Sequence, residues 1–93
     1  MPNEIRASHI LVASDKEAQD VKKKIEEGEK FARAAKRFSS CPSSENGGDL
    51  GFFGQGQMVP EFETAAFAAP LNKVVGPVKT QFGYHLIMVT EKK

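Results

Sequence analysis

Residues 47–62 have the sequence GGDLGFFGQGQMVPEF, in which five of the protein's eight glycines are mixed with six large apolar side chains. Closely spaced glycines permit sharp bends, because glycine adopts backbone conformations that other residues avoid. Such bends leave several apolar side chains free to line a concavity. Those side chains are Leu50, Phe53, Met58 and Phe62. The stretch therefore predicts an apolar binding pocket.

The length and composition fit one ordinary globular domain over residues 1–93, with 40% hydrophobic and 27% charged residues. No apolar run approaches the roughly 20 residues that a membrane helix needs. The first residues, MPNEIRASH, lack the charged start and apolar stretch of a signal peptide. The single cysteine, Cys41, has no partner for an internal disulfide, which agrees with a reducing compartment. We therefore expect a cytoplasmic protein.

The charges are unevenly distributed along the chain, although the net charge is only +1. Residues 22–37 contain seven basic and three acidic side chains, whereas residues 45–63 contain four acidic and no basic ones. A basic run of this kind most often forms a solvated helix face. It permits weak contact with anionic surfaces, but no motif typical of nucleic-acid binding is present, so we expect no nucleic-acid partner.

The first half of the chain predicts one strand and two helices. Residues 4–13, EIRASHILVA, end in apolar and β-branched side chains, and their alternation indicates a buried strand that carries His9. Ser14 begins a capping-box pattern, so a helix is expected to start there and to end near Gly28. Residues 31–38 have apolar side chains at helical spacing, which predicts a second amphipathic helix.

The second half predicts a helix and three further strands. Residues 39–48 suit a loop or a single helical turn, because the segment is rich in polar residues, glycine and proline. The expected elements are a strand over 49–53, a helix over 60–68, and strands over 74–79 and 84–91 joined by a loop of about four residues. Consecutive strand pairing and segregated helices predict an α+β fold with an antiparallel sheet.

Four polar residues form a candidate constellation. His9 and His85 lie in predicted strands, and if the first and last strands pair, the two imidazoles would face each other about 5 Å apart. Cys41 and Thr80 complete the set. Taken singly, each histidine is equally well explained as a hydrogen-bonded core residue.

Two further interpretations use the same residues. A zinc site could be built from His9, Cys41 and His85, but they are widely scattered and no second cysteine is present. A cysteine hydrolase would pair Cys41 with one histidine, yet no local signature of such enzymes surrounds it. The residues alone leave these alternatives open.

Five motifs follow one another along the chain: ASHILV (7–12), FSSCPSS (38–44), GGDLGFFGQGQM (47–58), PEF (60–62) and GPVKTQFGYHLI (76–87). They resemble those of the parvulin-type peptidyl-prolyl cis/trans isomerases, and most closely the small single-domain prokaryotic members. The resemblance covers essentially the whole chain. It implies a four-stranded antiparallel sheet wrapped by three to four helices in the order β-α-α-α-β-α-β-β, and rotation of the bond before proline without metal or cofactor.

The resemblance also implies roles for individual positions. Leu50, Met58 and Phe62 correspond to the family's proline pocket, which Gln57 adjoins. Phe82 stands where phosphate-dependent members usually carry serine, so an aromatic ring there enlarges the apolar wall. The residues that match the family's catalytic positions are His9, Cys41, Thr80 and His85.

The expected substrates are proline-containing peptides and unfolded or folding proteins. Phosphate-dependent parvulins carry a basic cluster after the first strand, but here that loop is the short segment 13–15, which has no cation. A phosphate would instead meet Asp15 and the acidic segment that holds Asp49. We therefore expect unphosphorylated substrates with small or apolar residues before proline.

Some alternatives concern the mechanism and the class of function. Because no bond must be made, a noncovalent twist of the amide suffices, and Cys41 could act electrostatically or as a nucleophile. The same groove could also serve a proline-motif binding module or a chaperone-like holdase whose isomerase activity is incidental. We expect a monomer.

Overall fold

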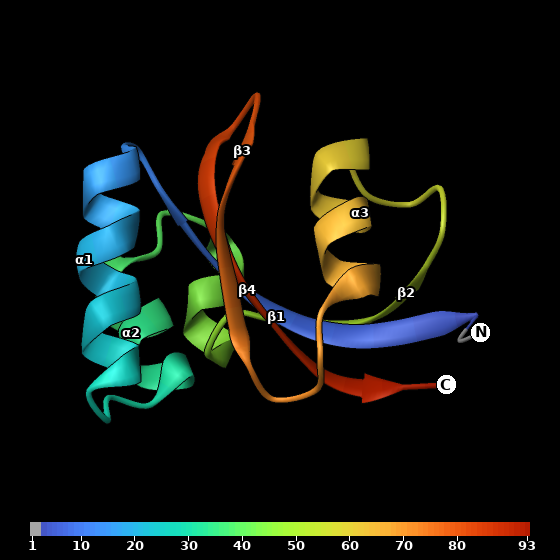
Figure 1. Cartoon of the computed structure of the whole chain (residues 1–93), viewed down its shortest axis with the longest axis horizontal. Helices are drawn as coiled ribbons and strands as arrows, with labels where there is room; N and C mark the ends of the chain where they lie inside the picture. The colour runs from blue at the N-terminus through green and yellow to red at the C-terminus, as the bar shows by residue number, and fades with distance from the viewer. Residues whose placement is uncertain (1–2) are drawn as a thin grey trace.

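The computed structural model describes residues 3–93 and contains a four-stranded antiparallel sheet with helices on both faces (Figure 1). The order across the sheet is β2-β1-β4-β3. The strands are β1 (Glu4–Val12), β2 (Asp49–Gly54), β3 (Val74–Thr80) and β4 (Gly83–Lys92). This arrangement confirms the predicted α+β class and the antiparallel sheet.

Three α-helices and one short 3₁₀ helix complete the fold. In Figure 1, α1 and α2 lie on one side of the sheet and α3 lies on the other. Both predicted boundaries of the second and third α-helices are confirmed. The elements are α1 (Asp15–Glu26), α2 (Phe31–Phe38), the 3₁₀ helix η1 (Pro42–Asn46) and α3 (Pro60–Ala68).

Strand β1 is central, so both of its faces are buried. Ile5, Ala7 and His9 are buried on the α3 side, as the alternation predicts. Ile10 and Val12 are buried on the other side, under α1 and α2. The strand therefore delivers one polar side chain, His9, into an otherwise apolar face.

Helix α1 begins where the sequence indicates. The Ser14 hydroxyl oxygen accepts the Glu17 backbone N–H at 3.1 Å, which satisfies one of the free donors of the first turn. Beyond the helix, Gly28 has a positive φ of 123°, a conformation that suits glycine. The predicted start and stop signals both act locally, so they could be read without tertiary information.

The connection from α2 to β2 forms a single helical turn, η1, which is one of the two forms expected for this segment. It ends at Gly47 in the left-handed conformation, with φ 69°. Gly48 follows with φ 86°, and its carbonyl oxygen accepts the His9 backbone N–H at 2.9 Å. A Cβ at position 48 would collide with the His9 carbonyl oxygen, so glycine allows β2 to approach β1 directly beside the histidine.

The β3–β4 hairpin differs from the sequence prediction in its loop. Thr80 pairs with Gly83, which leaves a loop of two residues, Gln81 and Phe82, rather than about four. The Thr80 hydroxyl oxygen accepts the Phe82 N–H at 3.2 Å and tightens the turn. A Cβ at Gly83 would lie 2.6 Å from the Val12 carbonyl oxygen, so the missing side chain lets β4 start at that point.

Two hydrophobic clusters lie on opposite faces of the sheet. The cluster on the α3 side includes Ile5, Phe53 and Phe62, and the cluster under α1 and α2 includes Val21 and Phe31. Within residues 3–93, no helix has the length and apolar character required to cross a membrane.

Candidate active site

A groove of about 550 Å³ brings together eight of the ten residues that the sequence singles out. It lies on the α3 side of the sheet and is bordered by β1, β4, α3, the start of η1 and the β3–β4 turn. The eight predicted residues are His9, Cys41, Leu50, Gln57, Met58, Phe62, Phe82 and His85. Thr80 and Phe53 do not line the groove and lie behind it.

The two histidines face each other, as predicted from strand pairing. Leu11 is opposite His85 and His9 is opposite Ile87 in the β1–β4 register, so the imidazoles are diagonal neighbours on one face. Their Nδ1 atoms are 3.0 Å apart, and the ring centroids are 5.2 Å apart with nearly parallel planes. One Nδ1 therefore donates a hydrogen bond and the other accepts it.

Thr80 extends this pair into a chain of three buried groups. Its hydroxyl oxygen lies 2.7 Å from His85 Nε2. If the hydroxyl donates to Nε2, His85 donates from Nδ1 to His9; if it accepts from Nε2, the direction reverses. Thr80 thus couples the tautomers of the two imidazoles, while His9 Nε2 is buried without a hydrogen-bond partner among residues 3–93.

Both imidazoles are held in the neutral form near pH 7. Burial, with a smaller contribution from His85, lowers the pKa of His9 to about 4. Burial also lowers the pKa of His85. A charged imidazolium is disfavoured because the surrounding side chains cannot replace its hydration. The polar wall of the groove is therefore uncharged.

Phe62 of α3 forms the apolar wall next to the histidines. Its ring meets His9 and His85 edge-on, with centroid distances of 5.6 and 5.3 Å. Leu50 and Met58 are half-buried and pack against the same cluster. This wall places apolar side chains directly beside the polar pair.

Phe53 was expected in the concavity, and this prediction is wrong. Its side chain is only 2% exposed and packs behind Phe62, with ring centroids 6.1 Å apart. Successive side chains of β2 point to opposite faces, so Phe52 is exposed while Phe53 enters the core. Phe53 supports the position of Phe62 and does not contact the groove.

Cys41 lies at the groove with its thiol partly exposed. The Ser43 hydroxyl donates a hydrogen bond to Cys41 Sγ at 3.3 Å. No bond joins Sγ to either imidazole in the described part of the chain, so the geometry does not resemble a cysteine–histidine nucleophile pair. Nor does any group of three His, Cys, Asp or Glu side chains among residues 3–93 have an arrangement that could hold a metal ion.

None of the residues that line the groove carries a formal charge. Asp49, expected to face a bound phosphate, is instead engaged by Arg6, with Nη2–Oδ2 and Nε–Oδ1 distances of 2.6 and 3.1 Å. This ion pair lowers the pKa of Asp49. Arg6 alternates with the buried residues of β1 that face α3, and Asp49 is not among the residues that line the groove.

The family model of the PPIC-type PPIase domain matches residues 1–93. The chain belongs to this family, the parvulin-type peptidyl-prolyl isomerases. Its sequence is 54% identical over 90 residues to the foldase protein PrsA of Geobacillus sp. (strain WCH70), an alignment that covers 96% of this chain and 33% of PrsA.

Solved structures share the fold closely. The crystal structure of PrsA from Bacillus subtilis has a TM-score of 0.93 and 52% identity, with 96% of this chain and 35% of that chain covered. The solution structure of the parvulin NmPin of Nitrosopumilus maritimus has a TM-score of 0.88 and 41% identity, with 98% of this chain and 99% of that chain covered. The chain thus spans about a third of the foldase relatives and almost all of the archaeal parvulin.

The groove of this parvulin domain also contains four residues that the sequence analysis did not assign to it. Leu11 lies two positions after His9 on the same strand, so alternation alone was a usable signal. The others neighbour assigned residues along the chain, but nothing local indicates which way their side chains point. The four are Leu11, Ser40, Pro42 and Val59.

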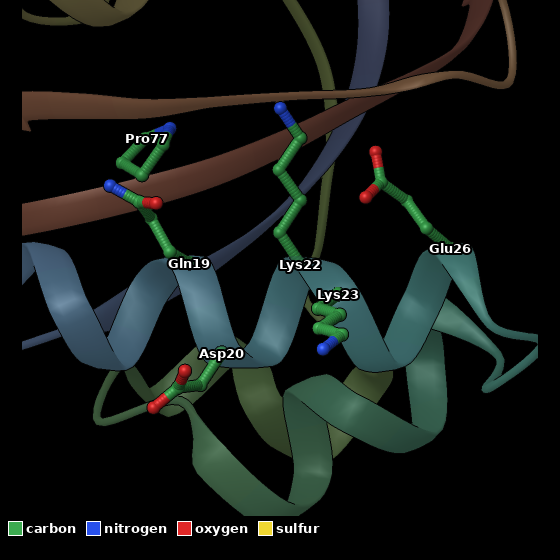
Figure 2. A pocket seen from close by; sticks show the side chains of 6 residues that line it. All are labelled: Gln19, Asp20, Lys22, Lys23, Glu26 and Pro77. Atoms are coloured by element: carbon green, nitrogen blue, oxygen red, sulfur yellow. The ribbon is translucent and has the colours of Figure 1, made fainter.

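A second hollow, of about 410 Å³, lies between α1 and Pro77 of β3 (Figure 2). Its walls mix acidic and basic side chains, and Lys22 Nζ donates to the Gly76 carbonyl oxygen at 2.9 Å. Figure 2 shows Lys22 extending toward the strand, whereas Asp20 and Lys23 point away from it. Because its polar groups do not converge, we do not assign a function to this hollow in the parvulin domain.

Proposed function

We propose that this parvulin domain isomerises X-Pro bonds of unphosphorylated peptides and folding proteins by a noncovalent twist of the amide. The observation that carries the proposal is the neutral, buried histidine pair set edge-on against Phe62 in a groove without charged side chains. Such a groove suits a prolyl ring next to an amide whose polarity changes during rotation.

The physical task is to lower a rotational barrier and not to make a bond. Amide resonance gives a barrier of about 18 to 20 kcal/mol. The planar amide is more polar than the twisted one, so a water-poor apolar site favours the twisted state relative to the ground state. A gain of roughly 10³ to 10⁵ in rate needs about 4 to 7 kcal/mol, more than one ordinary hydrogen bond supplies. Several modest contributions must combine.

Different residues of the groove supply these contributions. Leu50, Met58 and Phe62, which we call the ring wall, hold the prolyl ring; burying it contributes on the order of 2 kcal/mol to binding. That contribution is shared by the ground and transition states, so it does not itself accelerate rotation. His9 and His85, fixed by Thr80, orient the polar side of the groove, and Cys41 sets the polarity near the rotating carbonyl.

Peptides that differ only in the residue before proline test the substrate class. Alanine, leucine, glutamate and phosphoserine should be compared by exchange NMR, which measures the interconversion rate directly. We expect the apolar peptides to be accelerated most and phosphoserine least, because the residues that line the groove include no Lys or Arg to pair with the dianion. A preference for phosphoserine would reject the proposed substrate class.

Two substitutions at Cys41 separate electrostatic from covalent action. Cys41→Ser removes the thiolate chemistry while keeping a small polar group, and Cys41→Asp replaces the thiol by a carboxylate. Near-complete retention of kcat/KM in Cys41→Asp would exclude obligatory attack by sulfur. Loss of more than about a thousandfold in both variants, with folding intact, would contradict the noncovalent role.

A holdase function is the second candidate, and one comparison favours it. The domain is 40% identical, with a TM-score of 0.92, to a chain of the SurA-like chaperones PEB4 and Cj1289 of Campylobacter jejuni, covering 100% of this chain and 40% of that one. Binding of an X-Pro peptide without any change in its exchange rate would favour this alternative.

Cytoplasmic location and weak contact of the basic helix faces with anionic surfaces stay predictions. Cell fractionation would test the first, and binding to anionic vesicles would test the second.

A further inference from the structure

The loop that carries Met58 of the ring wall joins β2 to α3 and consists of residues 55–59. It contains Gly56, whose φ of 87° lies in the left-handed region. Glycine loses more conformational freedom on folding than any other residue, so a loop of this kind keeps one shape only where further contacts hold it. The position of Met58 in the groove therefore depends on what fastens this loop.

Glu63 of α3 fastens the loop at two points. Its side-chain Oε1 accepts the Gly56 N–H at 2.5 Å, across seven positions of the chain. Its backbone N–H donates to the Val59 carbonyl oxygen at 2.9 Å, in the first turn of the helix. Both bonds end on one helical residue. The segment from Gly56 to Val59 is therefore held at both ends, with Met58 between them.

Gln57 adds a third bond within the same segment. Its side-chain Oε1 accepts the Gly54 N–H at 3.0 Å, which ties the loop to the end of β2. Gln57 and Met58 both line the groove, whereas Glu63 does not. Because Glu63 contacts the loop and lies outside the groove, it acts on a bound peptide only through the residues that the loop carries.

The bond from Glu63 is the stronger of the two side-chain bonds. A carboxylate that accepts a backbone N–H forms a charge-assisted hydrogen bond, which is shorter than a bond between neutral groups and roughly twice as strong. The distances agree, since the carboxylate bond is 2.5 Å long and the amide bond of Gln57 is 3.0 Å long. The Glu63 bond lies at the surface, so its removal should loosen the loop and leave the core intact.

We infer that Glu63 is a positioning residue of the isomerase, whose bond to Gly56 holds Met58 against the prolyl ring. The inference rests on the proposed function. The ring wall contributes binding that the ground and transition states share, so a displaced Met58 weakens binding and leaves the rotation step itself unaffected. Loss of the Glu63 bond should therefore raise KM and leave kcat nearly unchanged.

Three variants of α3 test the inference with one X-Pro peptide, whose kcat and KM come from exchange NMR at several peptide concentrations. Glu63→Ala removes the acceptor, and kcat/KM should fall by about fivefold, the rate equivalent of one ordinary hydrogen bond. Glu63→Gln keeps an acceptor oxygen and should recover most of this loss. Glu61→Ala is the matched control: it removes the same charge from the same helical turn, outside the groove, and should leave both constants unchanged.

A double-mutant cycle with Met58 shows whether Glu63 acts through that side chain. Once Met58→Ala has removed the contact with the prolyl ring, a loosened loop has no such contact left to lose. The double variant Met58→Ala/Glu63→Ala should therefore have the same kcat/KM as Met58→Ala alone. Losses that multiply in the double variant would overturn the inference, because Glu63 would then act on the reaction by another route.

The Gly56 amide gives a readout that does not involve catalysis. Its hydrogen exchange, followed by NMR, should be about tenfold faster in Glu63→Ala than in the wild type, because the bond that protects it is gone. It should be unchanged in Glu61→Ala. Unchanged exchange in Glu63→Ala would overturn the inference, and so would faster exchange with wild-type kinetic constants or a fall in kcat at constant KM.

Folding and the proposed function are checked separately. Thermal unfolding followed by circular dichroism shows whether each variant folds, and Glu63→Asp, one methylene too short to reach the Gly56 nitrogen, replaces Glu63→Ala if that variant does not fold. If the wild type accelerates no peptide, the proposed function fails, and the cycle is measured on the Kd of the same peptide. A weakening of about fivefold that is confined to chains with Met58 then supports the inference, and equal affinities overturn it.

Discussion

His9 and His85 show how burial, rather than local sequence, sets the protonation state of a side chain. Both side chains are less than a tenth exposed, and both have a pKa below the ordinary histidine value of 6.5. One hydrogen bond joins the two Nδ1 atoms, so protonating the ring that accepts it breaks that bond as well as adding a buried charge. The neutral tautomers are therefore part of the native structure.

The pH dependence of stability follows from these shifts. Below pH 6.5 the two histidines of the unfolded chain become protonated. In the folded protein the same histidines stay neutral until the pH reaches their lowered pKa, which is about 4 for His9. The free energy of unfolding should therefore be constant above about pH 7 and should fall as the pH drops toward 4, by at most about 1.4 kcal/mol per pH unit for each histidine. Urea unfolding from pH 7.5 to 4.5 measures this slope.

A histidine variant provides the control for this prediction. His9→Gln removes one of the two groups and should make the slope between pH 6.5 and 4.5 shallower. The carboxyl group of Asp49, whose pKa is lowered by Arg6, titrates below its ordinary value of 3.8 and so contributes outside this window. A wild-type free energy of unfolding that is the same at pH 7.5 and 5 would contradict the assignment of buried, neutral imidazoles.

Substitution of Met58 should affect catalysis more than it affects the stability of the fold. It is half-buried and packs against the α3 cluster, so Met58→Ala should lower the free energy of unfolding by about 1 kcal/mol, less than a fully buried methionine would. The prolyl ring loses one side of its contact, and we expect kcat/KM to fall by about tenfold. Exchange NMR on an X-Pro peptide measures the loss. Leu71→Ala, an exposed residue outside the groove, is the control, and full activity in Met58→Ala would contradict the ring wall.

At the scale of elements, α1 illustrates a signal that works locally. Ser14→Ala removes the acceptor for the Glu17 N–H, and we expect the free energy of unfolding to fall by about 1 kcal/mol. Activity well below the melting temperature should not change, because α1 covers the face of the sheet opposite the groove. Denaturant unfolding and the peptide assay together test this. Ser14→Asp, which retains a capping oxygen, should recover most of the stability.

The segment from α2 to β2, in contrast to α1, is positioned by contacts with residues far away in the sequence. Its single helical turn could be predicted from Pro42 and the following glycines, yet its position relative to β1 could not. That position depends on bonds from Ser39 and Ser40 to Leu11, residues 28 and 29 positions away in the sequence. These contacts bring Cys41 to the groove, so the placement of this residue is a tertiary effect.

For the whole molecule, the surface supports the expectation of a monomer. The exposed large apolar side chains of residues 3–93 are Phe52, Leu71 and Phe82, which belong to three different segments. Exposed apolar residues scattered in this way are normal on a monomer, whereas stable homodimers bury extended apolar surfaces. Analytical ultracentrifugation at micromolar concentration should give the mass of one chain. A concentration-independent mass of two chains would contradict the prediction.

The sequence by itself determined the order and type of the elements and identified eight of the twelve groove residues. The elements follow from periodicity, capping and glycine spacing, which act over a few residues, whereas several groove residues, such as Gln57 and Phe82, were assigned through the resemblance to the parvulin family. The bounds of α3, for example, were predicted from Pro60 and the apolar run that follows it.

Only the tertiary structure decided the rest, because it depends on contacts between residues far apart in the chain. The ion pair of Asp49 with Arg6, for example, joins residues 43 positions apart in the sequence. The core position of Phe53, the two-residue turn that carries Phe82 and the tautomer chain from Thr80 to His9 depend on strand register and packing. Local patterns do not specify register, so these features required the folded molecule.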